Sequence, residues 1–341
     1  MTAFPALIDK LQRRVDLTVD EAAGAMETIM DGQAAPSQVA ALLVGLSMKG
    51  ERPDEIVGLA RTMRARATKL SKSFAPVFDT CGTGGDGAHT FNVSTVAALV
   101  LAACGVRVAK HGNRSASSRC GSADLFETLG VNVAATPPIV ERCLDEAGIA
   151  FLFAQVFHPS MRHAAATRKE LGVRTAFNLL GPLTNPAGAA RQLVGVPRPE
   201  LTELVARSLA QLGAERAWVV HGADGLDEIS TTGYTKVSEC RDGAVNTFYV
   251  HPGDVGLPKA VPDALRGGDT QDNAAIARSV LAGEPGAPRD IVLFNAGVAL
   301  LIAGRTATIP DGIAMAAEAI DSGRARQVLD TLVRVSQEGR A

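Results

Sequence analysis

Apolar residues recur at helical spacing from Ala3 to Leu70, with little alternation of β-branched residues. Thr18 and Glu21 have the spacing of a capping box in front of the segment AAGAMETIM. Proline and two acidic residues at positions 53–55 precede IVGLARTMRARA, where the start of a helix favours them. The pattern therefore predicts an amino-terminal bundle of about three or four short helices.

After residue 73 short apolar runs alternate with helical segments. APVFDTC (75–81) predicts a strand, STVAALVLAACG (94–105) a helix ended by Gly105, and VRVAKHG (106–112) a second strand. RAWVVHG (216–222) and DIVLFNAGVALLIAG (290–304) continue the alternation, with helices between them. This order predicts an α/β fold with a mostly parallel sheet, whose ligands bind beyond the carboxyl ends of its strands.

A segment near the middle of the chain is predicted to cross between the two parts. HPSMRHAAATRKELG (158–172) predicts a helix that stops at Gly172, and NLLGPLTNPAG (178–188) is a connection rich in proline and glycine. We therefore predict a small helical domain over residues 1–72, a crossover at about 165–190, and a larger α/β domain formed by residues 73–164 and 191–341.

Composition and charge narrow the classes of function. A net charge of −2 gives the chain no overall positive charge to hold a polyanion, so nucleic acid is not the expected partner. Five cysteines without a C-x-x-C pair suggest neither a disulfide framework nor a zinc knuckle, and favour a reducing cytoplasm. The opening MTAFPALIDKLQRRVD lacks the apolar core of a signal peptide, and the longest apolar run, Val96–Cys104, is too short to span a bilayer. We expect a cytoplasmic protein.

A glycine-rich loop follows the first predicted strand. Gly82, Gly84 and Gly87 have the G-x-G-x-x-G spacing of a dinucleotide-binding loop, but such a site needs an acidic residue about 20 positions later. From position 87 to 123 the chain has no acidic residue and carries four cations, Arg107, Lys110, Arg114 and Arg119. The pattern favours a localised phosphate site, in which glycines and the unpaired N–H groups of the next helix start approach the anion.

Acidic residues follow a later predicted strand at the same edge of the sheet. Asp224, Asp227 and Glu228 come just after the strand that ends near residue 220. Alone, this cluster would also fit a solvated turn. Beside a phosphate loop it predicts a magnesium site, because Mg²⁺ is commonly held by one or two carboxylates together with phosphate oxygens and water.

Several segments, in this order and spacing, resemble the anthranilate phosphoribosyltransferase family. They are GTGGDG (82–87), TFNVST (90–95), KHGNRSASS (110–118), GSADLFETLG (121–130), HPSMRHAAATRKELGVRTAFNLLGPLTNPA (158–187) and HGADGLDEIS (221–230). The resemblance implies an enzyme that joins anthranilate to 5-phosphoribosyl 1-diphosphate and releases diphosphate, the second step of tryptophan biosynthesis from chorismate. It also implies Mg²⁺ as cofactor and a homodimer joined through the helical domains.

The resemblance implies roles for particular residues. 5-Phosphoribosyl 1-diphosphate would bind Gly82, Gly85, Asp86, Thr90, Asn92, Val93, Ser94, Thr95, Lys110, His111, Gly112, Asn113, Arg114, Ser115, Ala116, Ser117, Ser118 and Ser122. Anthranilate would meet Gly82, His111, Asn113, His158 and Arg168, and the metal ligands would be Ser94, Asp227 and Glu228. Lys110, Asn113 and Arg168 would support the transition state, with no nucleophilic side chain, because the amine of anthranilate attacks.

Two positions differ from the residues that are most common in this family. His89 stands where Asn or Lys is more usual, and Gln155 stands where Pro is common, near the expected entrance for anthranilate.

Two other functions stay open. One alternative is a pyrimidine nucleoside phosphorylase, and the other is a non-catalytic relative that binds nucleic acid. KHGNRS and the Asp227–Glu228 pair favour the diphosphate-using enzyme. His111 could accept a proton or orient the substrate, and His221 is expected to be a hydrogen-bonded residue at a strand end.

Overall fold

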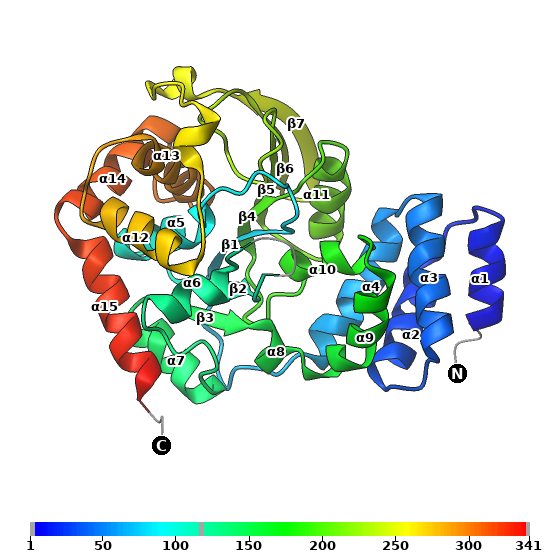
Figure 1. The fold of residues 1–341 in the computed structure, drawn as a ribbon. Helices are drawn as coiled ribbons and strands as arrows, with labels where there is room; N and C mark the ends of the chain where they lie inside the picture. Colours follow the sequence, from blue (N-terminus) through cyan, green and yellow to red (C-terminus); the bar gives the residue numbers. More distant parts are fainter. Residues whose placement is uncertain (1–3, 116–118, 339–341) are drawn as a thin grey trace.

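The computed structural model describes residues 4–115 and 119–338, which form a helical bundle beside a larger α/β body (Figure 1). Thr18 and Glu21 make the expected capping box, because each side chain accepts a hydrogen bond from the other's backbone N–H. In the described part of the chain the bundle consists of α1 (Phe4–Gln12), α2 (Val19–Met30), α3 (Pro36–Lys49) and α4 (Pro53–Arg66).

A mixed sheet forms the centre of the α/β body. Its strands are β1 (Phe78–Gly82), β2 (Val108–Gly112), β3 (Ile149–Phe153), β4 (Arg191–Gly195), β5 (Arg216–Gly222), β6 (Thr235–Arg241) and β7 (Ala244–Val250). Their order is β3-β2-β1-β4-β5-β6-β7, with the first five strands parallel and with β6 and β7 joined to them by antiparallel pairing. The predicted mostly parallel sheet is confirmed. Because the chain winds outward in opposite directions from β1 and β4, a ligand crevice is expected between their carboxyl ends.

Helices cover both faces of the sheet and create two hydrophobic cores. Leu193 and Trp218 belong to the core beneath α5 (Val93–Ala103), whereas their neighbours Val194 and Val219 belong to the other core. That second core joins β4 and β5, α11 (Leu201–Gln211) and the helical bundle into one apolar body. The remaining helices of the body are α6 (Ser122–Thr128), α7 (Pro137–Glu146), α12 (Thr270–Leu281), α13 (Ala287–Ile302), α14 (Ile309–Asp321) and α15 (Arg324–Gln337), with 3₁₀ turns at Pro252–Val255 and Pro262–Leu265.

The segment DIVLFNAGVALLIAG, which its apolar run places among the predicted strands, instead forms most of α13, so this prediction is wrong. Residues 291–300 are all buried, so this part of the helix shows no polar face and its apolar run cannot be distinguished from a buried strand by periodicity. Pro288 at the first turn was the available signal for a helix. Asn295 caps a neighbouring turn, since its side chain bonds the backbone of Ile229 in both directions.

The crossover segment contains more helix than expected. It forms α8 (Ala154–Phe157), a 3₁₀ turn at Pro159–Met161, α9 (Arg162–Leu171) and α10 (Phe177–Leu183), the last of which was expected to be an irregular connection. Gly172 ends α9 as predicted, with a left-handed φ of +62°. Helix α9 packs against α2 and α3, and α10 packs against α4. Among the described residues, no helix has both the length and the apolar character needed to cross a membrane.

Candidate active site

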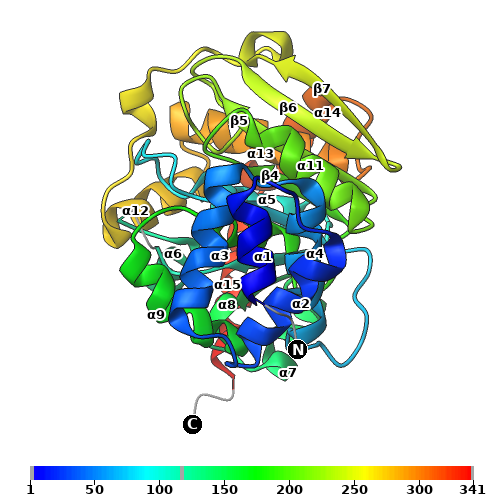
Figure 2. The same cartoon turned by 90° about the vertical axis from the view of Figure 1, so that its right-hand side faces the viewer.

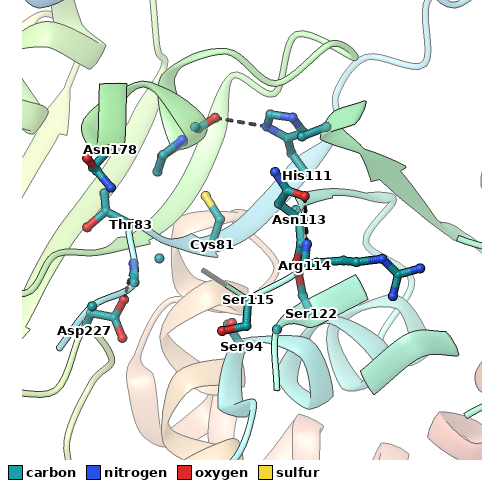
Figure 3. Close-up of a pocket in the computed structure, with 18 of the residues that line it drawn as sticks. Cys81, Thr83, Ser94, His111, Asn113, Arg114, Ser115, Ser122, Asn178 and Asp227 are labelled. Carbon is teal, nitrogen blue, oxygen red and sulfur yellow. Dashed lines mark hydrogen bonds between the residues drawn. The ribbon is translucent and has the colours of Figure 1, made fainter. Parts of the chain in front are cut away.

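A cavity of about 830 Å³ opens at the carboxyl ends of the parallel strands, between the α/β body and the bundle. Gly82 at the end of β1, His111 in β2, Asp227 after β5 and Arg168 on α9 all line it. Figure 3 shows Thr83 and Asp227 on one side of this space and His111 and Asn113 on the other. The site therefore lies at the crevice between β1 and β4, where the chain winding reverses.

The structure brings the predicted site residues together in this cavity. Every described member of the predicted substrate and metal sets lines it except Val93, whose side chain is fully buried as the first residue of α5. Ala116, Ser117 and Ser118 lie outside the described residues. Segments that are far apart in the sequence thus converge on one space.

The glycine loop turns back over the edge of the sheet. Gly84, Gly85 and Gly87 have φ values of +63°, +76° and +71°, a region that glycine adopts without steric cost. The N–H of Gly84 donates to Oδ2 of Asp227 at 2.9 Å, and the N–H of Thr83 donates to the carbonyl of Gly195 at 2.9 Å. The loop is therefore shaped by contacts with the ends of β4 and β5 before any ligand is considered.

The start of α5 does not offer the unpaired N–H groups that the sequence suggested. The N–H of Val93 donates to the carbonyl of residue 91 at 2.8 Å, and that of Thr95 to the carbonyl of Asn92 at 3.1 Å. The N–H of Ser94 donates to Oε1 of Glu228 at 3.0 Å. These donors are already satisfied within the protein, so the Ser94 hydroxyl and the glycine loop, rather than the helix start, face the cavity as possible ligand contacts.

Asp227 and Glu228 form a pair of half-buried carboxylates at the cavity. Burial raises the pKa of Asp227 to about 7, with a further contribution from nearby Asp86. Burial and the charge of Asp227 raise the pKa of Glu228 to about 8. Two carboxylates that repel each other suit a divalent cation, and Ser94 adds a third oxygen.

The remaining ligands of such a cation would come from substrate or water. No group of three or more His, Cys, Asp or Glu side chains in the described ranges could hold a metal by itself. Asp224, the third member of the predicted acidic cluster, does not line the cavity, because its carboxylate accepts from Ser230 and Thr232 within the turn. Asp224 is therefore a turn residue, the alternative that the sequence left open for this cluster. Asp227 and Glu228 fit the oxygen-rich coordination of Mg²⁺.

Lys110 lines the floor of the cavity, with only 1% of its surface exposed. Its ammonium donates to the carbonyl of Thr80 and lies 3.4 Å from Oγ of Ser94. Burial lowers its pKa, while the neighbouring charges of Asp79 and Glu228 act in the opposite direction. Lys110 therefore contributes positive charge from below Ser94.

The other predicted cations are more dispersed than the sequence suggested. Arg107 lies at the amino end of β2, where it donates to the carbonyl of Phe74, and Arg119 does not line the cavity. Arg114 lines the cavity, but its guanidinium pairs with Asp124 and Glu127 and extends away from Ser94 in Figure 3. The four cations therefore do not all lie at the predicted phosphate site. A cation at the amino end of a strand cannot reach a ligand that binds beyond its carboxyl end.

His111 and His158 line one side of the cavity. Nδ1 of His111 bonds to the carbonyl of Gly181 at 3.0 Å (Figure 3), and its Nε2 is buried without a hydrogen-bond partner in the described chain. Burial lowers the pKa of His111 to about 3 and that of His158 to about 4. Both rings are therefore neutral at pH 7, and His111 presents an unprotonated Nε2.

Arg168 extends from α9 toward the same side. Its guanidinium lies over the ring of Phe177, 5.2 Å from the ring centroid, and makes no ion pair with any described residue. A planar guanidinium without an acidic partner suits a carboxylate ligand. His221, by contrast, bonds to the carbonyl of Val196 at 2.9 Å, as expected for a structural residue at a strand end.

His89 and Gln155, the two positions that differ from the residues common in the family, both line the cavity. His89 has φ of +54°, a left-handed conformation that Asn adopts more readily than most residues, which gives a physical reason for Asn at this position. Gln155 lies in the short helix α8 near His158.

The sequence reasoning missed several residues of the crossover. Arg162, Arg174 and Asn178 line the cavity, and Arg174 donates to the carbonyl of Gly84 at 2.7 Å. All three belong to the segment that joins the two halves of the fold: Arg162 begins α9, Arg174 follows its end, and Asn178 lies in the first turn of α10. Met63 from α4 also reaches the cavity, and nothing in its helical spacing distinguished it from core residues.

Comparison with known proteins identifies the family. Residues 5–67 match the helical bundle domain, and residues 75–326 the a/b domain, of a glycosyl transferase family. Anthranilate phosphoribosyltransferase of Moorella thermoacetica is 56% identical over 96% of this chain and 97% of its own length. The Symbiobacterium thermophilum enzyme is 54% identical over 98% of each chain.

Solved structures give the same result. The anthranilate phosphoribosyltransferase of Thermus thermophilus is 47% identical, with a TM-score of 0.91 over 97% of this chain and 99% of its own. The Saccharomyces cerevisiae enzyme, solved in complex with PRPP and Mg, is 28% identical, with a TM-score of 0.88 over 98% of each chain. With both domains matched and relatives more than half identical along almost its whole length, the chain belongs to the anthranilate phosphoribosyltransferase family.

Proposed function

We propose that this protein transfers the 5-phosphoribosyl group from 5-phosphoribosyl 1-diphosphate to the amine of anthranilate and releases diphosphate. This reaction is the second step of tryptophan biosynthesis from chorismate. The observation that carries the proposal is that one cavity brings the glycine loop and the Asp227–Glu228 pair together with Arg168 and two neutral histidines. One side suits a magnesium diphosphate and the other suits an aromatic acid.

Positioning and electrostatics would supply the catalysis on the donor side. Displacing diphosphate from C1 of the ribose develops positive charge on the sugar and negative charge on the leaving group. Ser94, Asp227 and Glu228 would hold Mg²⁺, which neutralises charge on the diphosphate when it is bound. The backbone of the glycine loop would orient the leaving group, with Lys110 adding positive charge beneath it.

The acceptor side would align the amine for attack. Arg168 would bind the carboxylate of anthranilate through its planar guanidinium. His111, with Nδ1 bonded to the Gly181 carbonyl, leaves Nε2 to accept a hydrogen bond from the amine. A pKa of about 3 makes this imidazole a weak base at neutral pH, so His111 would orient the amine rather than take its proton.

The quaternary structure is also proposed. The protein would form a cytoplasmic homodimer through its helical domain, residues 1–72, with the crossover at 165–190 leading to the α/β domain. Figure 2 shows α1 and α3 on the face of the bundle turned away from the α/β body, and Met48 on α3 leaves 73% of its surface exposed. Sedimentation of the Met48→Asp variant tests the interface, and an unchanged dimer would exclude Met48 from it.

The reaction is tested by the fluorescence of anthranilate. Loss of the fluorescence after addition of 5-phosphoribosyl 1-diphosphate and Mg²⁺, and its persistence when excess chelator is present from the start, would support the reaction and the metal site together. If the folded protein binds the diphosphate substrate but leaves anthranilate fluorescent, the donor site is correct and the acceptor is wrong. Uridine or thymidine with phosphate would then be the next substrates to assay.

A further inference from the structure

Arg174 connects the crossover segment to the glycine loop. It follows the helix-ending Gly172 and lies at the rim of the cavity. Nη1 of its guanidinium donates to the carbonyl of Gly84 at 2.7 Å, and Nη2 donates to that of Thr83 at 3.4 Å. A side chain from the polypeptide between α9 and α10 thus bonds to two successive carbonyls of the loop that faces the diphosphate.

The peptide groups of this loop are held from opposite sides. Asp227 accepts the N–H of Gly84 at 2.9 Å, while Arg174 binds the carbonyl of the same residue. Gly195 accepts the N–H of Thr83 at 2.9 Å. Three separate elements therefore determine the path of the loop, and Arg174 is the one that comes from the acceptor side of the cavity.

The Arg174 guanidinium also fills the space beside the next glycine of the loop, Gly85. A Cβ at Gly85 would lie 1.7 Å from Nη1 of Arg174, whereas a Cβ at Gly84 would have nothing within 4 Å. Both glycines have positive φ, so a side chain would strain the backbone at either position. The two positions differ in whether Arg174 occupies the space that a side chain needs.

We infer that Arg174 is a positioning residue that holds the glycine loop in the conformation that binds the diphosphate substrate. Through the short segment after α9 it links that loop to the helix that carries Arg168. The inference rests on the proposed function, since it concerns the donor substrate of that reaction. Loss of the contact should weaken binding of 5-phosphoribosyl 1-diphosphate more than binding of anthranilate.

Steady-state kinetics of Arg174→Ala and Arg174→Lys test this role. We expect KM for the diphosphate substrate to rise roughly 10-fold or more in Arg174→Ala, the scale of a lost hydrogen bond from a charged donor, while KM for anthranilate changes little. Lysine can keep the bond to one carbonyl but not to both, so Arg174→Lys should restore part of the loss. Arg289→Ala is the matched control. Its guanidinium also donates to a backbone carbonyl, that of Gly283, at 2.6 Å, but Arg289 does not line the cavity.

A double-variant comparison tests whether Arg174 and the glycine loop act through the contact between them. Gly85→Ala should reduce binding of the diphosphate substrate and Mg²⁺, measured by calorimetry, much more in the presence of Arg174 than in the Arg174→Ala background. Gly84→Ala should have the same effect in both backgrounds, because its Cβ has no contact with Arg174. Equal effects of Gly85→Ala in both backgrounds, or equal rises in both KM values, would overturn the inference. An inactive wild-type protein would instead overturn the proposed function.

Discussion

The imidazole rings of His111 and His158 lie with their centroids 5.1 Å apart and their planes inclined by 56°, both buried beside the cavity. Burial, with a smaller contribution from the neighbouring His158, lowers the pKa of His111 to about 3, and burial lowers that of His158 to about 4. The pair is therefore stable as two neutral rings, and it forms a side of the cavity suited to an aromatic ring.

The first prediction concerns the dependence of stability on pH. Because the folded pKa values lie below the ordinary histidine value, the unfolded chain binds more protons than the folded one between about pH 6.5 and pH 4. Stability from the neutral pair is thus fully present above about pH 6.5 and is lost as the pH falls. Melting temperatures measured across this range should fall less steeply in a His111→Gln, His158→Gln double variant. The exposed His163 provides the control, and an equal flattening in His163→Gln would contradict the assignment.

The second prediction concerns the carboxylate pair. Partial burial and repulsion by Asp227 raise the pKa of Glu228 to about 8, so stability is lost progressively as the pH rises from about 4.5 to 8 and this half-buried group must ionise. In chelator, Glu228→Gln should therefore melt at a higher temperature than the parent at about pH 8. The same variant, and Asp227→Asn, should need a much higher Mg²⁺ concentration for half-maximal activity. An unchanged metal titration would remove these carboxylates from the metal site.

Lys110 gives the third prediction. Lys110→Ala should lower kcat/KM by roughly 10 to 100-fold, because a hydrogen bond from a charged donor contributes about 1.5–3 kcal/mol and each 1.36 kcal/mol is tenfold. The variant should also melt at a lower temperature, since the fully buried Asp79 loses the positive charge of Lys110, which favours its ionised form. Lys72→Ala, which breaks an exposed pair with Asp145, is the control. Parental kinetics in Lys110→Ala would show that the buried charge does not serve the reaction.

Arg168 gives the fourth prediction. Arg168→Ala should raise KM for anthranilate by roughly 10-fold or more, because the carboxylate would lose a planar, charged partner. Lys169→Ala changes the next residue of the same helix, which does not line the cavity, and should leave KM unchanged. If the two variants behave alike, the effect is a general one of charge on α9, and Arg168 does not bind the carboxylate directly.

The main architecture was predictable because each of its signals is local. The capping box at Thr18, the change from helical spacing to alternating strand and helix, and the glycine at position 172 each depend on a few neighbouring residues. Helix α13 was not predictable in this way, because complete burial removes the polar face that reveals a helix.

The site was predictable in its residues but not in its contacts. The glycine loop and the Asp227–Glu228 pair could be placed at one edge of the sheet from the strand order. Nothing in the sequence indicated that Glu228 accepts the N–H of Ser94 and so removes a donor from the helix start. The reach of Arg174 to Gly84 was equally hidden, because it spans 90 residues of sequence.

The position of α11 has a consequence for how the molecule unfolds. This helix packs against β5 on one side and α4 on the other, within an apolar core that continues into the bundle. Separating the bundle from the sheet would expose α11 and the apolar face of β4 and β5 to water, at a cost that grows with the area exposed. The two halves should therefore melt in one cooperative transition, and hydrogen exchange in the core of α4 should require the same opening as exchange in β5.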